Sequence, residues 1–562
     1  MSEPRPGQAP GPDDDGAEVA RWLARRRLAV VPLQDWGPFT DTLDWRLARC
    51  YWQDRGPTAF VGGDVPYAVN NDGRLAEDAA RVYAHAHAET PGPLTALEIG
   101  SGSGLFARLF LRALKRQNPE VAARTTYVAT DATEAMVRAL ADGGLLADAA
   151  GPVQTVRVAA PALAELGGRR VHAVFANYLL DNLPATLIRR TPDHIDEIVF
   201  RSVVDERVDM RALTGLAPEE IRRRLDAGDA EVERTLAPHA SSLAVEWRAE
   251  TRAVEDLPHG DLLAPAPAEG EQLSIHGTGT IAFLEQAMAL LEPGGFLLVA
   301  DYAAAPGGLS RVESVAQHFG GSMAHAVDFE QIDRWGRTLR GWQAFAPTAA
   351  SESIQVRLVC GQRHSAAIAP FLICFDGARW DLPAQLLRLA SECLDNHRHE
   401  TTRDMLLQAL EARPRNWYAL ERAAMFLLRS DRDPEAALVA AAAGLDLHPF
   451  HPGLWNLRGD AHYERREWPE AEAAFRRAIE IDPRDIRGRL NLSYVLADTL
   501  RYPEALALLG EALGLDMAAE HREVLLARQQ RILQQMSDRE RERLLHQANR
   551  VREHLGDDGG SA

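Results

Sequence analysis

The chain is poor in cysteine. Four cysteines occur among its 562 residues, and no two of them form a Cys-x-x-Cys pair. This spacing argues against a disulfide framework and against a cysteine zinc cluster. We therefore expect the protein to work in a reducing compartment, the cytoplasm. The four residues are Cys50, Cys360, Cys374 and Cys393.

Long apolar segments are also missing. No apolar run reaches about 18 residues, the length that suggests a membrane-spanning helix. The first 16 residues, MSEPRPGQAPGPDDDG, are rich in Pro, Gly and Asp and lack the apolar core of a secretion signal. The sequence predicts a disordered tail over residues 1–16 and no membrane partner.

The chain has no excess of positive charge. It holds 81 acidic and 62 basic residues, which give a formal net charge of -19. Such a charge disfavours attraction to the phosphates of nucleic acids and to anionic lipids. We expect no nucleic-acid partner.

What the chain does have is length, a hydrophobic content of 46% and two distinct patterns. Helical periodicity over 17–93 predicts a helical lead-in. Over 94–376, short β-branched runs alternate with helical patterns, which indicates a mostly parallel sheet covered by helices. Residues 185–280 form a long insertion with a charge-alternating stretch, EIRRRLDAGDAEVERTL, typical of a solvated helix. The expected strands are LTALEIG, TTYVATD, VQTVRVA, VHAVFAN and GGFLLVADY.

Three glycines stand at alternate positions in TALEIGSGSGLFARLF, residues 95–110. The dinucleotide fingerprint G-x-G-x-x-G needs a third glycine where this chain has Leu105, so a nicotinamide cofactor is disfavoured. What remains is Glu-x-Gly-x-Gly-x-Gly on a strand-to-helix turn, followed by a second strand that ends in Asp131. As an alternative, the glycines form only a tight turn and Asp131 is a helix N-cap.

This arrangement resembles the first two motifs of class I S-adenosylmethionine-dependent methyltransferases, which have a Rossmann-like α/β fold. The resemblance implies that S-adenosyl-L-methionine lies against the glycine turn, where bare backbone avoids a Cβ clash. Asp131 would accept the ribose hydroxyl hydrogens, and Glu98 would orient the ammonium of the amino-acid tail. The implied cofactor-binding residues are Glu98, Gly100, Ser101, Gly102, Gly104, Asp131, Ala132 and Asn177.

Three later segments, VFANYLLDNLPATLI, LLEPGGFLLVADYAAA and MAHAVDFEQI, resemble the MidA-like family of methyltransferases over roughly residues 60–375. The mitochondrial member of that family methylates arginine in a protein. Where the family has Glu after Asn, this chain has Tyr178, so a carboxylate that could hold a guanidinium is absent at that position. No acid or amide for the adenine follows the strand VQTVRVA, where Ala159, Ala160 and Pro161 stand instead.

Two residues of the fourth strand segment are the catalytic candidates. Asn177 would position the cofactor or the nucleophile, and Asp181 would orient the substrate or accept its proton. Asp181 could equally cap a helix that starts near Asn182, with Pro184 in its first turn. His325 lacks an identifiable carboxylate partner and is interpreted as a packed or surface histidine rather than a base.

Helical repeats follow. The alanines of DPEAALVAAAAGLDLHP, WPEAEAAFRRAIEIDP and YPEALALLGEALGLDM recur at the period of tetratricopeptide repeats, at Ala436, Ala471 and Ala505. We expect repeats over 383–519, with a weaker first copy, and capping helices over 520–556. Their concave face would hold a protein or peptide partner. Residues 375–383, FDGARWDLP, are interpreted as a linker.

The sequence thus predicts a cytoplasmic S-adenosylmethionine-dependent methyltransferase whose protein substrate, with arginine as a candidate side chain, is recruited by the repeats. Two alternatives stay open. One is an interaction scaffold whose methyltransferase-like domain is not catalytic. The other is a methyltransferase for small molecules. No metal is expected.

Overall fold

The structure is a computed structural model of the chain. In the part that it describes, no helix combines the length and apolar character needed to cross a membrane. The expected tail 1–16 and most of the expected final capping segment lie outside the described residues. The structure describes residues 29–60, 72–147, 149–265, 267–304, 308–319, 321–349, 351, 354–361, 366–516 and 519–536.

The chain divides into two compact units, each built from several stretches of sequence. The first unit comprises residues 1–54, 178–287 and 301–340. The second comprises residues 55–177, 288–300 and 341–562. The second unit therefore contains both the glycine turn and the repeats.

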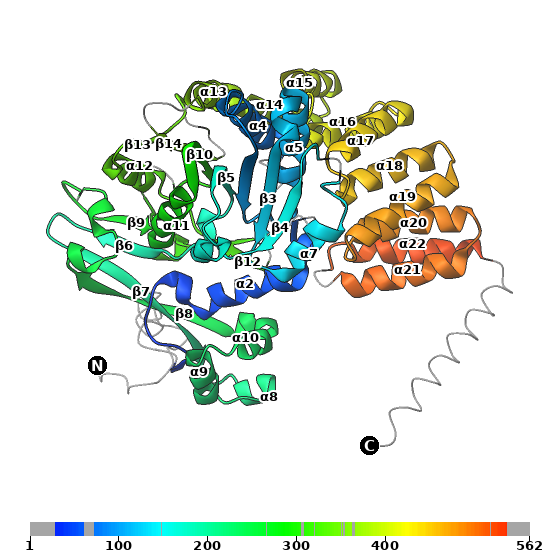
Figure 1. Ribbon diagram of the computed structural model, residues 1–562. Coiled ribbons are helices and arrows are strands. Elements are labelled where there is room, and N and C mark those ends of the chain that lie inside the picture. Colours follow the sequence, from blue (N-terminus) through cyan, green and yellow to red (C-terminus); the bar gives the residue numbers. More distant parts are fainter. Residues whose placement is uncertain are drawn as a thin grey trace, which may run out of the picture. The chain divides into compact units, whose positions relative to one another are not determined.

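A seven-stranded sheet forms the centre of the second unit (Figure 1). Strands β10, β5, β2, β3 and β4 pair in parallel, which confirms the five strands expected from sequence and the α/β fold class. Strands β13 and β14 form an antiparallel hairpin at one end. In spatial order the strands are β13 (Trp342–Phe345), β14 (Gln355–Gly361), β10 (Leu291–Asp301), β5 (Val171–Asn177), β2 (Leu94–Ile99), β3 (Thr125–Asp131) and β4 (Val153–Arg157).

Helices α4 and α5 pack on each other beside this sheet. Their apolar residues recur every three or four positions, and aromatic rings such as Phe110 and Phe175, 5.0 Å apart, fill the space beneath them. The shorter α6 begins with Pro119, and the Asn118 side chain caps it by accepting from the Val121 amide. The helices are η2 (Gly56–Phe60), α4 (Arg74–Ala86), α5 (Leu105–Gln117), α6 (Pro119–Ala123), α7 (Glu134–Asp142), η3 (Ala160–Leu166) and α13 (Ile368–Cys374).

The first unit contains a five-stranded antiparallel sheet that the sequence analysis did not anticipate. It draws a strand, β1, from the expected helical lead-in 17–93, which is therefore not wholly helical. Its strands are β1 (Val30–Pro32), β6 (Thr186–Arg190), β7 (Ile195–Asp205), β8 (Leu243–Arg252) and β9 (Gln272–His276), and β11 (Gln317–Phe319) pairs with β12 (Ser322–Ala324). Its helices are η1 (Phe39–Asp41), α2 (Leu43–Arg55), η4 (Leu180–Asn182), α8 (Met210–Thr214), α9 (Pro218–Asp226), α10 (Ala230–Leu236), η5 (Ala237–Ser242), η6 (Val254–Asp256), η7 (Gly260–Leu262), α11 (Thr278–Ala289), η8 (Val312–Ser314) and α12 (Phe329–Thr338).

The charge-alternating stretch of the insertion forms two helices rather than one solvated helix. Gly228 adopts a φ of 72° between α9 and α10, and the Asp229 side chain caps α10. Ile221 and Val232 are fully buried beneath these helices in one hydrophobic cluster. The apolar residues, although outnumbered by charges, therefore anchor both helices to the first unit.

Helical hairpins make up the C-terminal part of the second unit, coloured yellow to red from α16 to α22 in Figure 1. Consecutive helices pack as pairs, α14 with α15, α16 with α17, α18 with α19 and α20 with α21. Ala471 and Ala505 are fully buried at the helix crossings. The helices are α14 (Gly377–Asp395), α15 (His399–Ala412), α16 (Trp417–Arg429), α17 (Pro434–Leu447), α18 (Pro452–Glu464), α19 (Trp468–Ile481), α20 (Ile486–Asp498), α21 (Tyr502–Leu515) and α22 (Arg522–Gln535).

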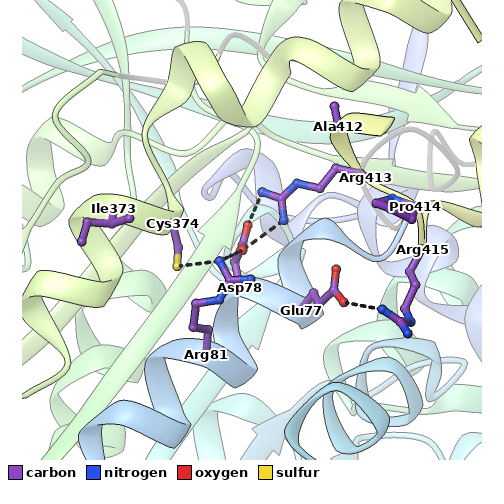
Figure 2. Close-up of a pocket in the computed structure, with 9 residues that line it drawn as sticks. All are labelled: Glu77, Asp78, Arg81, Ile373, Cys374, Ala412, Arg413, Pro414 and Arg415. Atoms are coloured by element: carbon purple, nitrogen blue, oxygen red, sulfur yellow. Dashed lines mark hydrogen bonds and ion pairs between the residues drawn. The ribbon is translucent and has the colours of Figure 1, made fainter. Parts of the chain in front are cut away.

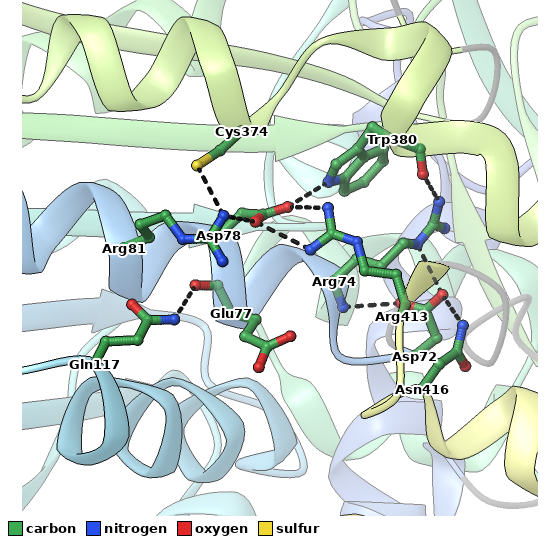
Figure 3. Close-up of polar contacts among 10 residues, drawn as sticks. All are labelled: Asp72, Arg74, Glu77, Asp78, Arg81, Gln117, Cys374, Trp380, Arg413 and Asn416. Atoms are coloured by element: carbon green, nitrogen blue, oxygen red, sulfur yellow. Dashed lines mark hydrogen bonds and ion pairs between the residues drawn. The ribbon is translucent and has the colours of Figure 1, made fainter. Parts of the chain in front are cut away.

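The first repeat hairpin is joined to α4 by a buried polar network (Figure 3). The carboxylate of Asp78, which has no exposed surface, accepts two hydrogen bonds from Arg413 at 3.1 and 2.7 Å and one from the Trp380 indole at 3.2 Å. The Arg74 guanidinium lies 4.4 Å from the Trp380 ring. The expected linker 375–383 is thus wrong, because α14 already begins at Gly377 and buries Trp380 against α4.

Candidate functional site

The carboxyl ends of β5, β2 and β3 lie at one edge of the seven-stranded sheet. Ile99 is the register partner of Ala176 on one side and of Thr130 on the other. Because the three strands run parallel, the next residue on each lies at the same edge, where open α/β sheets bind ligands. These next residues are Asn177, Gly100 and Asp131.

The glycine turn has a backbone that only glycine adopts without strain. Gly100, Gly102 and Gly104 have φ values of 73°, 49° and 77°, all in the left-handed region. A Cβ built on Gly102 would lie 2.7 Å from Cζ of Phe60. The Ser101 side chain accepts from the Thr130 amide at 3.2 Å and ties the turn to β3. The turn is therefore held in one conformation. Because its three glycines have no side chains, its backbone stays accessible at those positions.

Glu98 lies one residue before the end of β2 and is 2% exposed. The Tyr127 hydroxyl donates a hydrogen bond to its carboxylate at 2.9 Å. Burial raises the pKa of Glu98 to about 7, and the negative charge of Asp131 adds to this effect. A cation bound next to Glu98 would favour the ionised carboxylate.

Asp131 ends β3 and orients its neighbours rather than capping a helix. Its carboxylate accepts from the Thr133 amide at 2.9 Å and from the Gly102 amide at 3.2 Å. Thr133, not Asp131, is the N-cap of α7, which corrects the N-cap alternative. Burial raises the pKa of Asp131. Ala132, the next residue, accepts from Arg157 through its carbonyl.

Asn177 ends β5 with an unsatisfied side chain. Its amide nitrogen and oxygen are both buried, and neither has a hydrogen-bond partner within the described part of the chain. Leaving such a group without a partner costs about 1–3 kcal/mol, so an amide of this kind marks a place where a polar ligand fits.

Asp181 lies in the first unit, on the short turn η4. No helix follows it, since the next element is the strand β6, so the expectation that Asp181 caps a helix is wrong. Its carboxylate accepts from the Asn182 side chain at 2.6 Å. Burial raises the pKa of Asp181 to about 7.

Asp301, at the end of β10, fixes the position of this turn. One of its oxygens accepts from the Leu180 amide at 2.7 Å and the other from the Tyr302 amide at 2.8 Å. Burial and the adjacent charge of Asp181 raise its pKa well above the ordinary range. Two buried carboxyls therefore hold at least one proton near neutral pH.

His325 is a packed rather than a surface histidine. Its ring stacks on Trp45 with 5.8 Å between centroids, and its Nε2 lies 3.0 Å from the Leu183 carbonyl oxygen. Burial lowers its pKa. Tyr178, in contrast, has a φ of 53°, an unusual value for a residue with an aromatic side chain.

Two hollows of the second unit lie away from the glycine turn. One, of about 230 Å³, lies between α4, α13 and the end of α15 (Figure 2). The charged side chains that line it form ion pairs with one another, Asp78 with Arg413 and Glu77 with Arg415. The other is a groove of about 310 Å³ in the repeats, lined by Leu428, Arg429, Arg432, Asp460, Tyr463, Glu464, Phe475, Asn491 and Tyr494.

The repeat groove contains an arginine, Arg429, whose nearby carboxylate, Asp460, is paired with another residue. Arg429 forms no hydrogen bond or ion pair with any residue that the structure describes, whereas Asp460 pairs with Arg487 at 3.0 Å. Among the described residues there is also no cluster of side chains suited to a metal ion.

Sequence reasoning missed two residues of the site. Tyr127 lies diagonally across from Glu98 in the β2–β3 register, and a tyrosine within a strand of small and β-branched residues was the available signal. Phe60 lies on η2, far from the turn in sequence, and no pattern pointed to it.

Known families match the same two parts of the chain. Residues 75–348 match a family model described as "Putative S-adenosyl-L-methionine-dependent methyltransferase", and residues 452–485 match the tetratricopeptide repeat model. A search of curated proteins found no match.

Solved structures with partial similarity include a COG1565 superfamily member from Burkholderia thailandensis bound to S-adenosyl-homocysteine. The identity is 16%, the match covers 63% of this chain and 92% of that one, and the TM-score is 0.38. A second COG1565 superfamily protein from that organism is 17% identical over 58% of this chain and 76% of its own, with a TM-score of 0.37. A tetratricopeptide repeat protein of Thermus thermophilus is 18% identical over 30% of this chain and 99% of its own, with a TM-score of 0.23.

At these TM-scores the solved structures carry no weight for function. Residues 75–348, just under half of the chain, are thus similar to the S-adenosyl-L-methionine-dependent methyltransferase family, and residues 452–485 to a tetratricopeptide repeat.

Proposed function

We propose that the protein transfers the methyl group of S-adenosyl-L-methionine to a protein substrate that its repeats bind. The observation that carries the proposal is the Asn177 amide, buried and unpartnered in the described structure at the same sheet edge as the glycine turn and Asp131. A polar ligand at this edge would satisfy that amide.

The residues at the edge suit the parts of this cofactor. The Asp131 carboxylate is oriented by the Thr133 amide and hydroxyl and by the Gly102 amide, and its Oδ2 keeps a lone pair for a ribose hydroxyl. The Glu98 carboxylate would pair with the ammonium of the amino-acid tail. Bound there, the cofactor supplies a methyl group attached to a sulfonium. The sulfur leaves readily as a neutral thioether when the methyl group is transferred. The protein then needs to align the nucleophile and accept its proton.

Asp131→Ala is expected to weaken S-adenosyl-L-methionine binding at least about tenfold, because a charge-assisted hydrogen bond contributes about 1.5–3 kcal/mol. Calorimetric titration measures this directly. Arg138→Ala, which removes an exposed ion pair on α7, is the control and should bind normally. Unchanged affinity in folded Asp131→Ala would remove Asp131 from the site.

Asp181 is proposed as the proton acceptor. With a pKa near 7, it is protonated at acidic pH and able to accept a proton at alkaline pH. Turnover should therefore rise with pH through about 7, and Asp181→Asn should lower turnover by about 100-fold or more while S-adenosyl-L-methionine affinity stays within about twofold.

Stability separates this role from a structural one. Because the folded-state pKa of Asp181 is raised, its contribution to stability is fully present below about pH 4, near the unfolded-state pKa, and is lost as the pH rises through about 7. The neutral Asp181→Asn variant avoids that loss and should melt no lower than the parent protein at pH 8. A lower melting temperature with full turnover would make Asp181 a structural residue.

Arginine is the candidate acceptor only by resemblance to the MidA-like family. Tyr178 stands where a carboxylate would hold a guanidinium, so we propose a protein substrate and leave arginine to be tested. Hydrolysis of methylated protein and separation of its amino acids identifies the modified side chain.

Recruitment by the repeats is tested in the full chain with Arg429→Ala, since Arg429 lines the groove and its nearby carboxylate, Asp460, is already paired with Arg487. The tethered substrate gains local concentration without a change in chemistry, so KM should rise several-fold while kcat stays constant. Val439→Ser, at a residue 70% exposed on α17, is the control. An unchanged KM in Arg429→Ala would argue against recruitment through this groove.

The scaffold alternative is favoured by two observations, Tyr178 in place of the family's glutamate and the missing acid after β4. It predicts cofactor binding without methyl transfer. Incubating the protein with tritiated S-adenosyl-L-methionine and lysate, then separating protein from small molecules, distinguishes it from both a protein and a small-molecule methyltransferase.

A further inference from the structure

Strand β8 forms a long open edge of the five-stranded sheet. Its ten residues all pair with β7, from Leu243 opposite Val204 to Arg252 opposite Ile195. Within the described part of the chain, no strand pairs with its other side. An edge of about 33 Å presents a row of unpaired backbone donors and acceptors to any strand that fits.

One face of β8 is apolar and uncovered. Trp247 and Val245 are 43% and 40% exposed, and Ala249 on the same face is also exposed. Their neighbours on β7 include Phe200 and Ile198, which are buried. The apolar face of β7 therefore continues onto β8, where described residues leave it open.

The opposite face of β8 carries charged side chains that contact other residues of the chain. The guanidiniums of Arg201 and Arg248 lie 4.4 and 4.5 Å from the Trp36 ring, which packs against both. Glu246 accepts from Arg201 at 2.8 Å. The available surface is therefore the strand edge together with the apolar face that carries Trp247.

We propose that β8 pairs with β8 of a second copy of the chain, antiparallel, about a two-fold axis that passes through Trp247. Two copies of one strand related by an axis perpendicular to the sheet must place one residue opposite itself. Centring on Trp247 sets Glu246 opposite Arg248 of the second copy and Val245 opposite Ala249. Charges meet opposite charges and apolar side chains meet apolar ones.

The neighbouring registers do not place both opposite charges and apolar side chains across from each other. Centring on Glu246 sets two glutamates opposite each other, and centring on Arg248 sets two arginines opposite each other. Like charges directly opposite destabilise strand pairing. Centring on Ala249 keeps opposite charges together but sets Trp247 opposite the polar Thr251. Charge thus excludes the two adjacent registers, and the apolar stripe selects Trp247 over Ala249.

Sedimentation of the full chain at micromolar concentration should give twice the monomer mass of 61.8 kDa. Glu246→Arg alone and Arg248→Glu alone should each weaken the dimer at least tenfold, and the double variant E246R/R248E should restore it. The melting temperature of each variant shows that the fold persists.

A cross-link tests the register. Trp247→Cys should form a disulfide-linked dimer on mild oxidation, because that residue faces its own copy, whereas Ala249→Cys should not. A monomeric parent protein, a dimer that survives both single charge reversals, or cross-linking at Ala249→Cys equal to that at Trp247→Cys would overturn the proposal.

Discussion

Gly102→Val is expected to abolish measurable S-adenosyl-L-methionine binding, with a loss of at least about 100-fold in affinity. The backbone at this position has a φ of 49°, and the new Cβ would lie 2.7 Å from the Phe60 ring. A β-branched side chain cannot adopt this conformation without strain, and it would also occupy space against which the cofactor tail lies. Calorimetric titration measures the loss.

Gly167→Val is the matched control. Gly167 also has a positive φ, of 66°, but a Cβ there would meet no atom within 4 Å. This variant carries the same backbone strain outside the glycine turn, so it should bind the cofactor normally if it folds. Normal binding by Gly102→Val would mean that the glycines serve only the turn.

Asp78→Ala is expected to cost about 3–5 kcal/mol of stability, because it leaves the buried Arg413 guanidinium without its partner. Asp446→Ala removes a carboxylate that is 62% exposed and paired with Arg112, so it should cost less than about 1 kcal/mol. Urea unfolding of both variants measures the difference. Equal, small effects would show that the network around Asp78 does not hold α4 to the repeats.

The same network explains why the repeats should be tested by substitution rather than by truncation. A chain ending at residue 376 would lose Trp380 and Arg413 and leave Asp78 buried or newly exposed without either partner. The repeats and the seven-stranded sheet belong to one compact unit. Groove variants such as Arg429→Ala leave this unit whole.

The parallel sheet could be predicted because its strands are nearly continuous apolar runs that end in candidate site residues. Asp131 and Asn177 were found in this way, since the carboxyl ends of parallel strands share an edge. The glycine turn could be predicted because backbone positions with a positive φ strongly favour glycine.

The sheet of the first unit could not be predicted in this way. β1 pairs with β7 across about 170 residues of sequence, and β8 carries charges at almost every second position. The wrong prediction of a linker over 375–383 has the same cause, a contact between residues that are far apart in sequence. Asp-Gly in FDGARWDLP suggests a turn, but the buried partner of Trp380 lies on α4, some 300 residues earlier. Such long-range contacts leave no local pattern.

The most direct test of methyl transfer uses one preparation of the full chain for two readouts, calorimetric binding of S-adenosyl-L-methionine and transfer of its tritiated methyl group to protein in a lysate. The proposed function predicts binding, label in a protein, and loss of that label in Asn177→Ala with the fold retained. Binding without any transfer of label would contradict it.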